Sequence, residues 1–142
     1  MAESPNAQDS LANALAGPPT NGQLVVVVGT PGRTYWVDNN QLRWIPDTQT
    51  YNNIFLPNAS VNTISQLYNQ GPNLPSGSYL AANRPDLAVY LIEKNYNGSG
   101  RDMKRHIANP QSFSIGQFND QVIVDVTYTY INNCVPGPDI SY

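Results

Sequence analysis

One tryptophan, one arginine and three short polar side chains fall within a single short stretch of this sequence, between Trp36 and Arg43. Sugars present C–H groups on one face and hydroxyls at the rim, so proteins bind them with an aromatic ring edged by amides, carboxylates or guanidinium groups. Trp36 and Arg43 supply the ring and the cation, and the polar groups are Asp38, Asn39 and Asn40. We therefore expect a carbohydrate site here. The alternative interpretation is that Trp36 packs against the second half of the chain or against a neighbouring subunit.

A second set of candidate residues lies in a loop rich in glycine and asparagine. Tyr96, Asn97 and Arg101 belong to this loop, and Asp102 follows it. Tyrosine combined with asparagine and arginine is typical of binding loops, because it offers a rigid ring beside adaptable hydrogen-bonding groups. A flexible loop without a ligand explains the same composition, so both interpretations stay open.

Trp44 and His106 complete the set of candidate ligand-binding residues. They hold equivalent places in two similar segments, opposite Tyr35 and Tyr90 respectively. We expect both rings at the edge of the core, with their N–H groups donating to carbonyl oxygens. Contact with a ligand is the alternative.

The sequence contains no pattern that indicates catalysis. Glutamate occurs only at positions 3 and 93, and the single Cys134 and single His106 have no catalytic motif around them. The aspartates never follow the spacing of a calcium loop, and one histidine is insufficient for a zinc site. We expect no enzyme activity, no catalytic residue, no metal and no cofactor. Two alternatives stay open: a small hydrolase whose carboxylates pair only in three dimensions, and calcium held between loops that are distant in sequence.

The composition limits the classes of partner. Charged residues make up 12% of the 142 residues and the formal net charge is -3, so no basic surface for nucleic acid is expected. The longest apolar run, residues 24–28, is far shorter than the roughly 20 residues that a membrane span needs, and no secretory signal is visible. Neutral polar residues are abundant, which suits neutral polar ligands such as carbohydrate.

Short strands are expected to position the candidate residues. Hydrophobic patterning predicts strands at residues 22–28, 34–38, 41–45 and 122–130. Asn39 and Asn40 tolerate the positive φ angles of a two-residue hairpin loop, which places Val37 opposite Leu42, Tyr35 opposite Trp44, and Trp36 opposite Arg43. A short helix is expected within residues 46–56 and a loop at 71–77. Residues 61–68 have helical spacing, although a strand followed by a turn fits nearly as well.

The chain contains an internal duplication. Residues 77–80 match residues 22–25 at an offset of 55, and from Arg105, which matches Arg43, the offset is 62. The seven extra residues fall in the loop of the second hairpin, where an insertion disturbs no core. Leu91 takes the place of Trp36 in the second copy, which favours an apolar contact at that position.

Each copy alone would bury too little surface to be stable. We therefore predict a strand-dominated α+β fold, in which two tandem repeats, 22–76 and 77–142, pack into one pseudo-twofold domain. Residues 1–21 are expected to form a flexible arm.

Both copies resemble a family of short bacterial repeats, the first through residues 35–39 and 42–47 and the second more closely. Tyr90-Leu91-Ile92-Glu93 followed by the segment 104–113 is similar to the pattern Tyr-Leu-Ile-Glu-Asn-Gly-Lys-Lys-Arg-His-Ile-Pro-Asn-Pro-x-Thr-Phe. Such repeats occur in tandem on secreted or cell-surface hydrolases. The resemblance implies a non-catalytic accessory module that attaches to cell wall or glycan, and it favours an extracellular or cell-surface location.

These observations leave two leading hypotheses. The first is a carbohydrate-binding, lectin-like module that recognises a glycan or a cell-wall saccharide. The alternative is a self-associating structural or assembly protein. A homo-oligomer is compatible with both, because linked weak sites gain avidity on a multivalent surface. Two repeats predict two similar sites if the ligand binds within a repeat, or one site if it binds between them.

Overall fold

The computed structural model describes residues 18–84 and 88–142, so most of the expected N-terminal arm lies outside the described residues. The first half of the chain contains β1 (Leu24–Val27), β2 (Tyr35–Asp38), β3 (Gln41–Trp44), α2 (Thr48–Ile54) and β4 (Val61–Ile64). The second half contains β5 (Tyr79–Ala82), β6 (Val89–Glu93), η2 (Tyr96–Gly98), β7 (Met103–His106), α3 (Pro110–Ile115), η3 (Asp120–Val122), β8 (Val124–Asp125), α4 (Tyr128–Asn133) and β9 (Val135–Pro136). Among the described residues, no helix has the length and apolar character that a membrane crossing requires.

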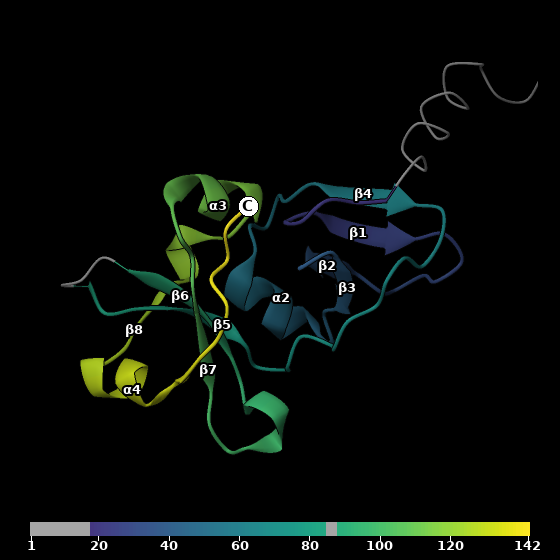
Figure 1. Cartoon of the computed structure of the whole chain (residues 1–142). Helices are drawn as coiled ribbons and strands as arrows, with labels where there is room; N and C mark the ends of the chain where they lie inside the picture. The colour runs from purple at the N-terminus through teal and green to yellow at the C-terminus, as the bar shows by residue number, and fades with distance from the viewer. Residues whose placement is uncertain (1–17, 85–87) are drawn as a thin grey trace, which may run out of the picture.

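The strands form two mixed sheets, so the chain has a mixed α and β fold, as the expected α+β class implies. The strand order is β3-β2-β1-β4 in the first sheet and β8-β5-β6-β7-β9 in the second. In each sheet the first three strands in sequence are antiparallel neighbours, and a later strand runs parallel beside the first of them. Figure 1 shows the two sheets side by side, with α2 between them.

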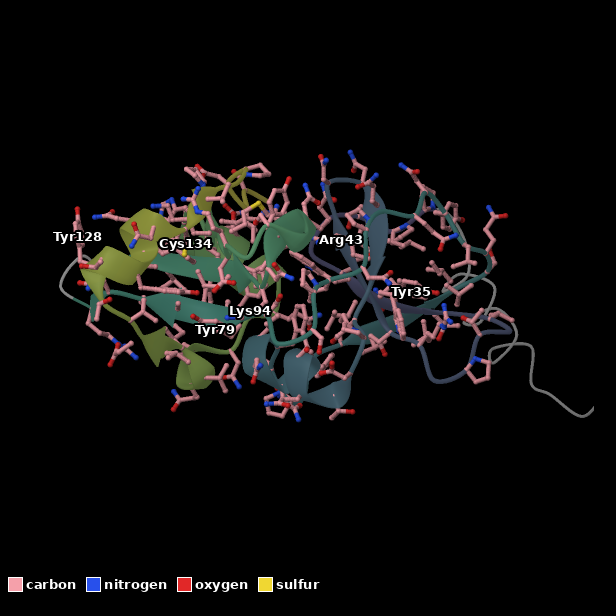
Figure 2. All side chains as sticks on the ribbon, turned by 90° about the horizontal axis from the view of Figure 1, so that it is seen from below. Tyr35, Arg43, Tyr79, Lys94, Tyr128 and Cys134 are labelled. Carbon is pink, nitrogen blue, oxygen red and sulfur yellow. The ribbon has the colours of Figure 1, made fainter. Side chains whose placement is uncertain are left out.

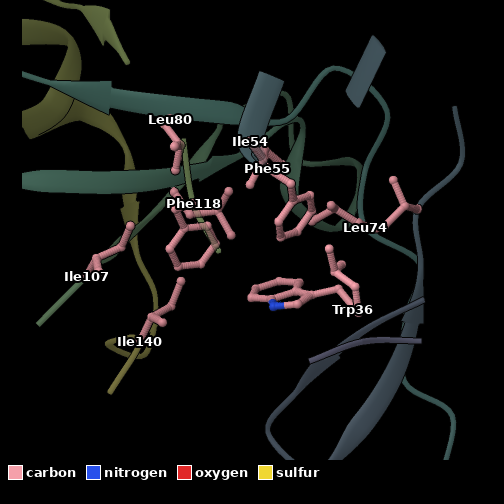
Figure 3. Close-up of a cluster of buried hydrophobic side chains, with 11 residues drawn as sticks. Trp36, Ile54, Phe55, Leu74, Leu80, Ile107, Phe118 and Ile140 are labelled. Atoms are coloured by element: carbon pink, nitrogen blue, oxygen red, sulfur yellow. The ribbon is translucent and has the colours of Figure 1, made fainter. Parts of the chain in front are cut away.

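The main hydrophobic core lies between the two halves and draws on both. Trp36 and Phe55 come from the first half, and Phe118 comes from the second. The ring centroids of Trp36 lie 6.2 Å from Phe55 and 6.3 Å from Phe118 in edge-on arrangements (Figure 3). The other buried members are aliphatic: Leu24, Ile45, Ile54, Leu74, Leu80, Leu91, Ile107 and Ile140. Because this core spans both sheets, the halves bury their apolar faces against each other.

The predicted hairpin and helix of the first half are confirmed. Asn39 and Asn40 have φ angles of 52° and 59°, and the register pairs Trp36 with Arg43. The side-chain oxygen of Asp47 accepts a hydrogen bond from the Thr50 N–H at 2.7 Å, which caps the first turn of α2. For residues 61–68 the strand alternative is correct, because β4 pairs with β1.

The strand predicted at residues 122–130 is wrong for most of its length. Only β8 pairs with the second sheet, through two residues. The hydroxyl of Thr127 accepts a hydrogen bond from the Tyr130 N–H at 3.1 Å and caps α4, so the chain turns into a helix. Ile131 of this helix is buried in a cluster with Ile92 of the sheet. Burial of the helix face therefore overrides the alternating pattern of valine, threonine and tyrosine.

Candidate functional site

Trp36 does not form an exposed aromatic surface, so that part of the predicted carbohydrate site is wrong. Its side chain is fully buried in the core between the halves. The indole N–H has no hydrogen-bond partner in the described part of the chain. The alternative interpretation, that Trp36 packs against the second half, is the one that the structure shows.

Asp38 and Arg43 are also buried, in a cluster of four charged side chains between the halves. We call this set, Asp38, Arg43, Glu93 and Arg105, the ion cluster. Arg43 donates two hydrogen bonds to the carboxylate of Glu93, one of them at 2.9 Å. Arg105 donates two to Asp38, at 2.6 and 3.0 Å. Each arginine of one half thus binds a carboxylate of the other half, and Figure 2 shows Arg43 where the halves meet.

Further contacts fix the two guanidinium groups in place. The Nε atom of Arg43 donates to the Pro72 carbonyl at 3.0 Å, and that of Arg105 donates to the Pro138 carbonyl at 2.9 Å. Burial lowers the pKa of Arg43, but the hydrogen bonds and charge of Glu93 more than offset it, so the net pKa is raised. The ion cluster is therefore a fully paired structural element with no free charge for a ligand.

A shallow central pocket of about 250 Å³ lies over the ion cluster. Besides Asp38 and Arg43 of the ion cluster, Asn39 and Tyr96 line it from opposite halves, so it brings together residues from both predicted binding segments. Asn40 does not line it, and its backbone N–H donates to Asn21 at 2.7 Å. The central pocket offers neutral polar groups at its rim above charges that are already paired.

The loop of the second half is held by its own hydrogen bonds. Asp102 accepts hydrogen bonds from the Tyr130 hydroxyl, from Lys94 Nζ at 3.1 Å and from the Asn95 N–H at 3.0 Å. The guanidinium of Arg101 donates to the carbonyl of Asn133 at 2.7 Å. Arg101 and Asp102 therefore fasten the loop to α4. Of the predicted loop residues, Asn97 is exposed and has a φ of 52°.

Asp102 should make stability depend on pH in the acid range. Burial raises its pKa, but the hydrogen bonds from Tyr130, Asn95 and Lys94 more than offset this, so its pKa lies below the ordinary value of 3.8. A carboxyl with a lowered folded-state pKa adds stability above its unfolded-state pKa and loses it as the pH falls through the folded value. We expect Asp102→Asn to melt at a lower temperature than the native chain at neutral pH, with a difference that shrinks as the pH falls below the ordinary carboxyl pKa of 3.8.

Thermal unfolding followed by circular dichroism across this pH range measures the effect. Exposed Asp139→Asn is the matched control, and it should melt close to the native chain at neutral pH. A difference between native chain and Asp102→Asn that does not change with pH would contradict this role for the carboxylate.

Two larger pockets lie on the two halves and are lined by corresponding residues. The first-half pocket has a volume of about 350 Å³ and the second-half pocket about 430 Å³. Six residues of the first-half pocket have a counterpart 62 positions later in the second-half pocket. They are Trp44 and His106, Ile45 and Ile107, Pro46 and Ala108, Asp47 and Asn109, Thr48 and Pro110, and Tyr51 and Phe113. Both pockets thus use the end of the hairpin and the first turn of the following helix.

The first-half pocket has the chemistry of a site for neutral polar ligands. It combines the half-buried rings of Trp44 and Tyr51 with the hydroxyls of Thr34 and Thr48. The guanidinium carbon of Arg33 lies 4.7 Å from the centroid of the Trp44 ring. Aromatic rings edged by hydroxyl and guanidinium groups match the alternation of C–H faces and hydroxyls on a sugar.

Asp47 adds a carboxylate to this pocket. A hydrogen bond from Ser76, followed by the N–H of Thr50, lowers its pKa, so it is charged at neutral pH. Its oxygens are acceptors, which fits them to ligand hydroxyls as well as to the helix that it caps.

The second-half pocket is more apolar. Val89, Pro110 and Phe113 stand where the first-half pocket has Thr34, Thr48 and Tyr51, so three hydroxyls are missing. The ring of His106 packs at 5.5 Å from that of Tyr90. His106 therefore lines a pocket, as Trp44 does, but in a different chemical setting.

The sequence pattern indicated Trp44 but not most of the residues that line the first-half pocket. It did not single out Thr34, Thr48 or Tyr51, and it assigned residues 46–56 only to a short helix. One signal points to these residues. The offset of 62 between matching residues applies to the end of the hairpin and the start of the helix. The segment around Trp44 can therefore be compared with the segment around His106 position by position.

No candidate metal centre is present in the described ranges. No group of three or more acidic, histidine or cysteine side chains could hold a metal ion there. Cys134 is buried, and burial raises the pKa of its thiol, which disfavours the reactive thiolate. Comparisons with protein families, with curated proteins and with solved structures found no match to this chain.

Proposed function

We propose that this protein is a non-catalytic, lectin-like module and that its first-half pocket binds a saccharide of a glycan or cell wall. The observation that carries the proposal is the pairing of the Trp44 and Tyr51 rings with Thr34, Thr48 and the Asp47 carboxylate in one open pocket. Its volume of about 350 Å³ lies in the range of about 300–1,000 Å³ typical of small-molecule sites. In this proposal a sugar ring contacts the Trp44 and Tyr51 side chains that line the pocket, and its hydroxyls bond to the polar rim.

We also propose that the two halves are copies of one unit related by a pseudo-twofold axis. Supporting this, the two sheets share the same antiparallel and parallel pairings, and the two pockets share positions at one constant offset. The second copy lacks the three hydroxyls of the first-half pocket, so in this proposal only the first copy binds the saccharide. Binding of one saccharide per chain is the expected stoichiometry.

The repeat itself supplies the variants that test the saccharide site. Trp44→His installs the residue that the second half carries at this position, so the backbone should accept it. Loss of the indole should weaken glycan binding by on the order of tenfold or more. Tyr51→Phe, which copies Phe113, removes only one hydroxyl and should give a smaller loss. The measurement is a glycan array with the labelled chain, followed by titration calorimetry on the best ligand.

His106→Ala in the second-half pocket is the matched control and should leave glycan binding unchanged. Repeating the array with EDTA tests whether calcium takes part, and we expect no change. Two results would contradict the proposal: an array on which the native chain binds nothing, or a Trp44→His variant that binds as well as the native chain. Melting curves of each variant exclude misfolding as the cause of lost binding.

A further inference from the structure

The outer edge of β4 in the first sheet offers hydrogen-bonding groups that no described residue uses. The Val28 N–H donates to the Ile64 carbonyl at 3.0 Å, so the backbone of Ile64 faces β1. Because successive residues of a strand point their N–H and C=O groups to opposite sides, Asn62 also faces β1, while Val61 and Thr63 face outward. Outside the β1–β4 ladder, no hydrogen bond joins the backbone groups of Val61 and Thr63 to the rest of the described chain. Figure 1 shows β4 at the margin of the first sheet.

This edge lacks the features that normally prevent strands from pairing between molecules. Residues 48–83 contain no charged side chain, and β4 contains no proline. Val61 is 41% exposed, and Val28, which lies beside the end of β4, is 55% exposed. An uncharged edge with exposed apolar side chains is a template for another strand.

The corresponding edge of the second sheet is protected. There β8 has only two residues, and its Asp125 forms an exposed ion pair with Arg84. Short edge strands and charged side chains are the usual means of blocking intermolecular pairing. The contrast within one molecule singles out β4 as the open edge.

The outward backbone N–H and C=O groups of β4 can pair with the same groups in a second copy of the chain. Val61 and Thr63 are two residues apart, so an antiparallel copy of β4 centred on Asn62 places Val61 of one chain opposite Thr63 of the other. Each such pair exchanges two hydrogen bonds in an antiparallel ladder, and the twofold axis generates the second pair. All outward N–H and C=O groups of the two residues are then satisfied in both chains.

We propose that β4 pairs with β4 of a second copy of this chain and joins two first sheets into one continuous sheet. Such an interface is isologous and closes as a twofold dimer. The proposal does not depend on glycan binding, although a dimer would present two first-half pockets to a multivalent surface.

The test is sedimentation velocity of the native chain over a range of concentrations, compared with two edge variants. Thr63→Pro removes an outward N–H without touching the hydrogen bonds to β1, and edge strands tolerate such a proline. It should weaken dimerisation by about a hundredfold, because one hydrogen bond per chain is lost. Val61→Lys places a charge at the edge and should weaken dimerisation to a similar extent. It provides the test if Thr63→Pro folds poorly.

Val124→Lys on the protected edge is the matched control and should dimerise like the native chain. A native chain that stays monomeric up to its solubility limit would overturn the proposal. Folded edge variants that dimerise as well as the native chain would also overturn it, as would an open-ended assembly in place of a dimer.

Discussion

Replacing Trp36 with alanine is expected to destabilise the fold by about 3–5 kcal/mol, which is the usual cost of deleting a fully buried aromatic side chain. The ring packs edge-on against Phe55 and Phe118 and joins the two halves in one core. Domains of this size have total free energies of unfolding of about 5–15 kcal/mol, so this substitution would remove a large part of the stability. Urea unfolding followed by circular dichroism measures the loss.

Two other tryptophan variants make this prediction specific. Trp36→Phe keeps an aromatic ring in the core and removes the buried N–H that has no partner among the described residues, so it should cost far less than alanine. Trp44→His lies at the half-buried edge of the first sheet and should also cost less. If Trp36→Ala unfolded at the same urea concentration as the native chain, the role of this ring in joining the halves would be refuted.

Replacing Arg43 with methionine is expected to cost about 3–5 kcal/mol, because Glu93 would then be buried without its bidentate partner. Only one hydrogen bond to Glu93 from the described side chains, donated by Arg105 at 3.2 Å, would remain. The same urea titration measures the change. Arg84→Met is the matched control, since the Arg84–Asp125 pair is solvent-exposed and should contribute about 0–1 kcal/mol.

A double variant separates the two explanations of a large loss. Arg43→Met combined with Glu93→Met removes both buried charges of one pair. It should be more stable than Arg43→Met alone, because no unpaired carboxylate is left in the interior. The opposite result would be a double variant that is less stable than Arg43→Met by the full cost of another core substitution. In that case the loss in Arg43→Met would come from the packing of the guanidinium and not from its charge.

The sequence singled out two residues that line pockets in the structure. It identified Trp44 and His106 as equivalent residues, and both line pockets. It placed Trp36 on an exposed face because strand alternation assigns residues to two sides without saying which side will be covered. Here both sides of the first hairpin are covered, since Tyr35 and Val37 are buried on the side opposite Trp36.

Local chemistry determined the hairpin and the start of α2, and direct comparison of two segments suggested the proposed repeat. Asn39 and Asn40 fixed the register of β2 and β3, and Asp47 fixed the first turn of the helix. The offset of 62 between matching residues relates the segments that line the two pockets. Each of these features depends on residues a few positions apart or on direct comparison of two segments.

Only the tertiary structure decided what lies between the halves. Arg43 and Glu93 are 50 positions apart, and Asp38 and Arg105 are 67 apart, yet these pairs form the buried ion cluster. Helix α4 forms where a strand was predicted, because its residue Ile131 is buried in a cluster with Ile92 of the second sheet. Such outcomes depend on contacts between distant segments, which the periodicity of a single strand does not encode.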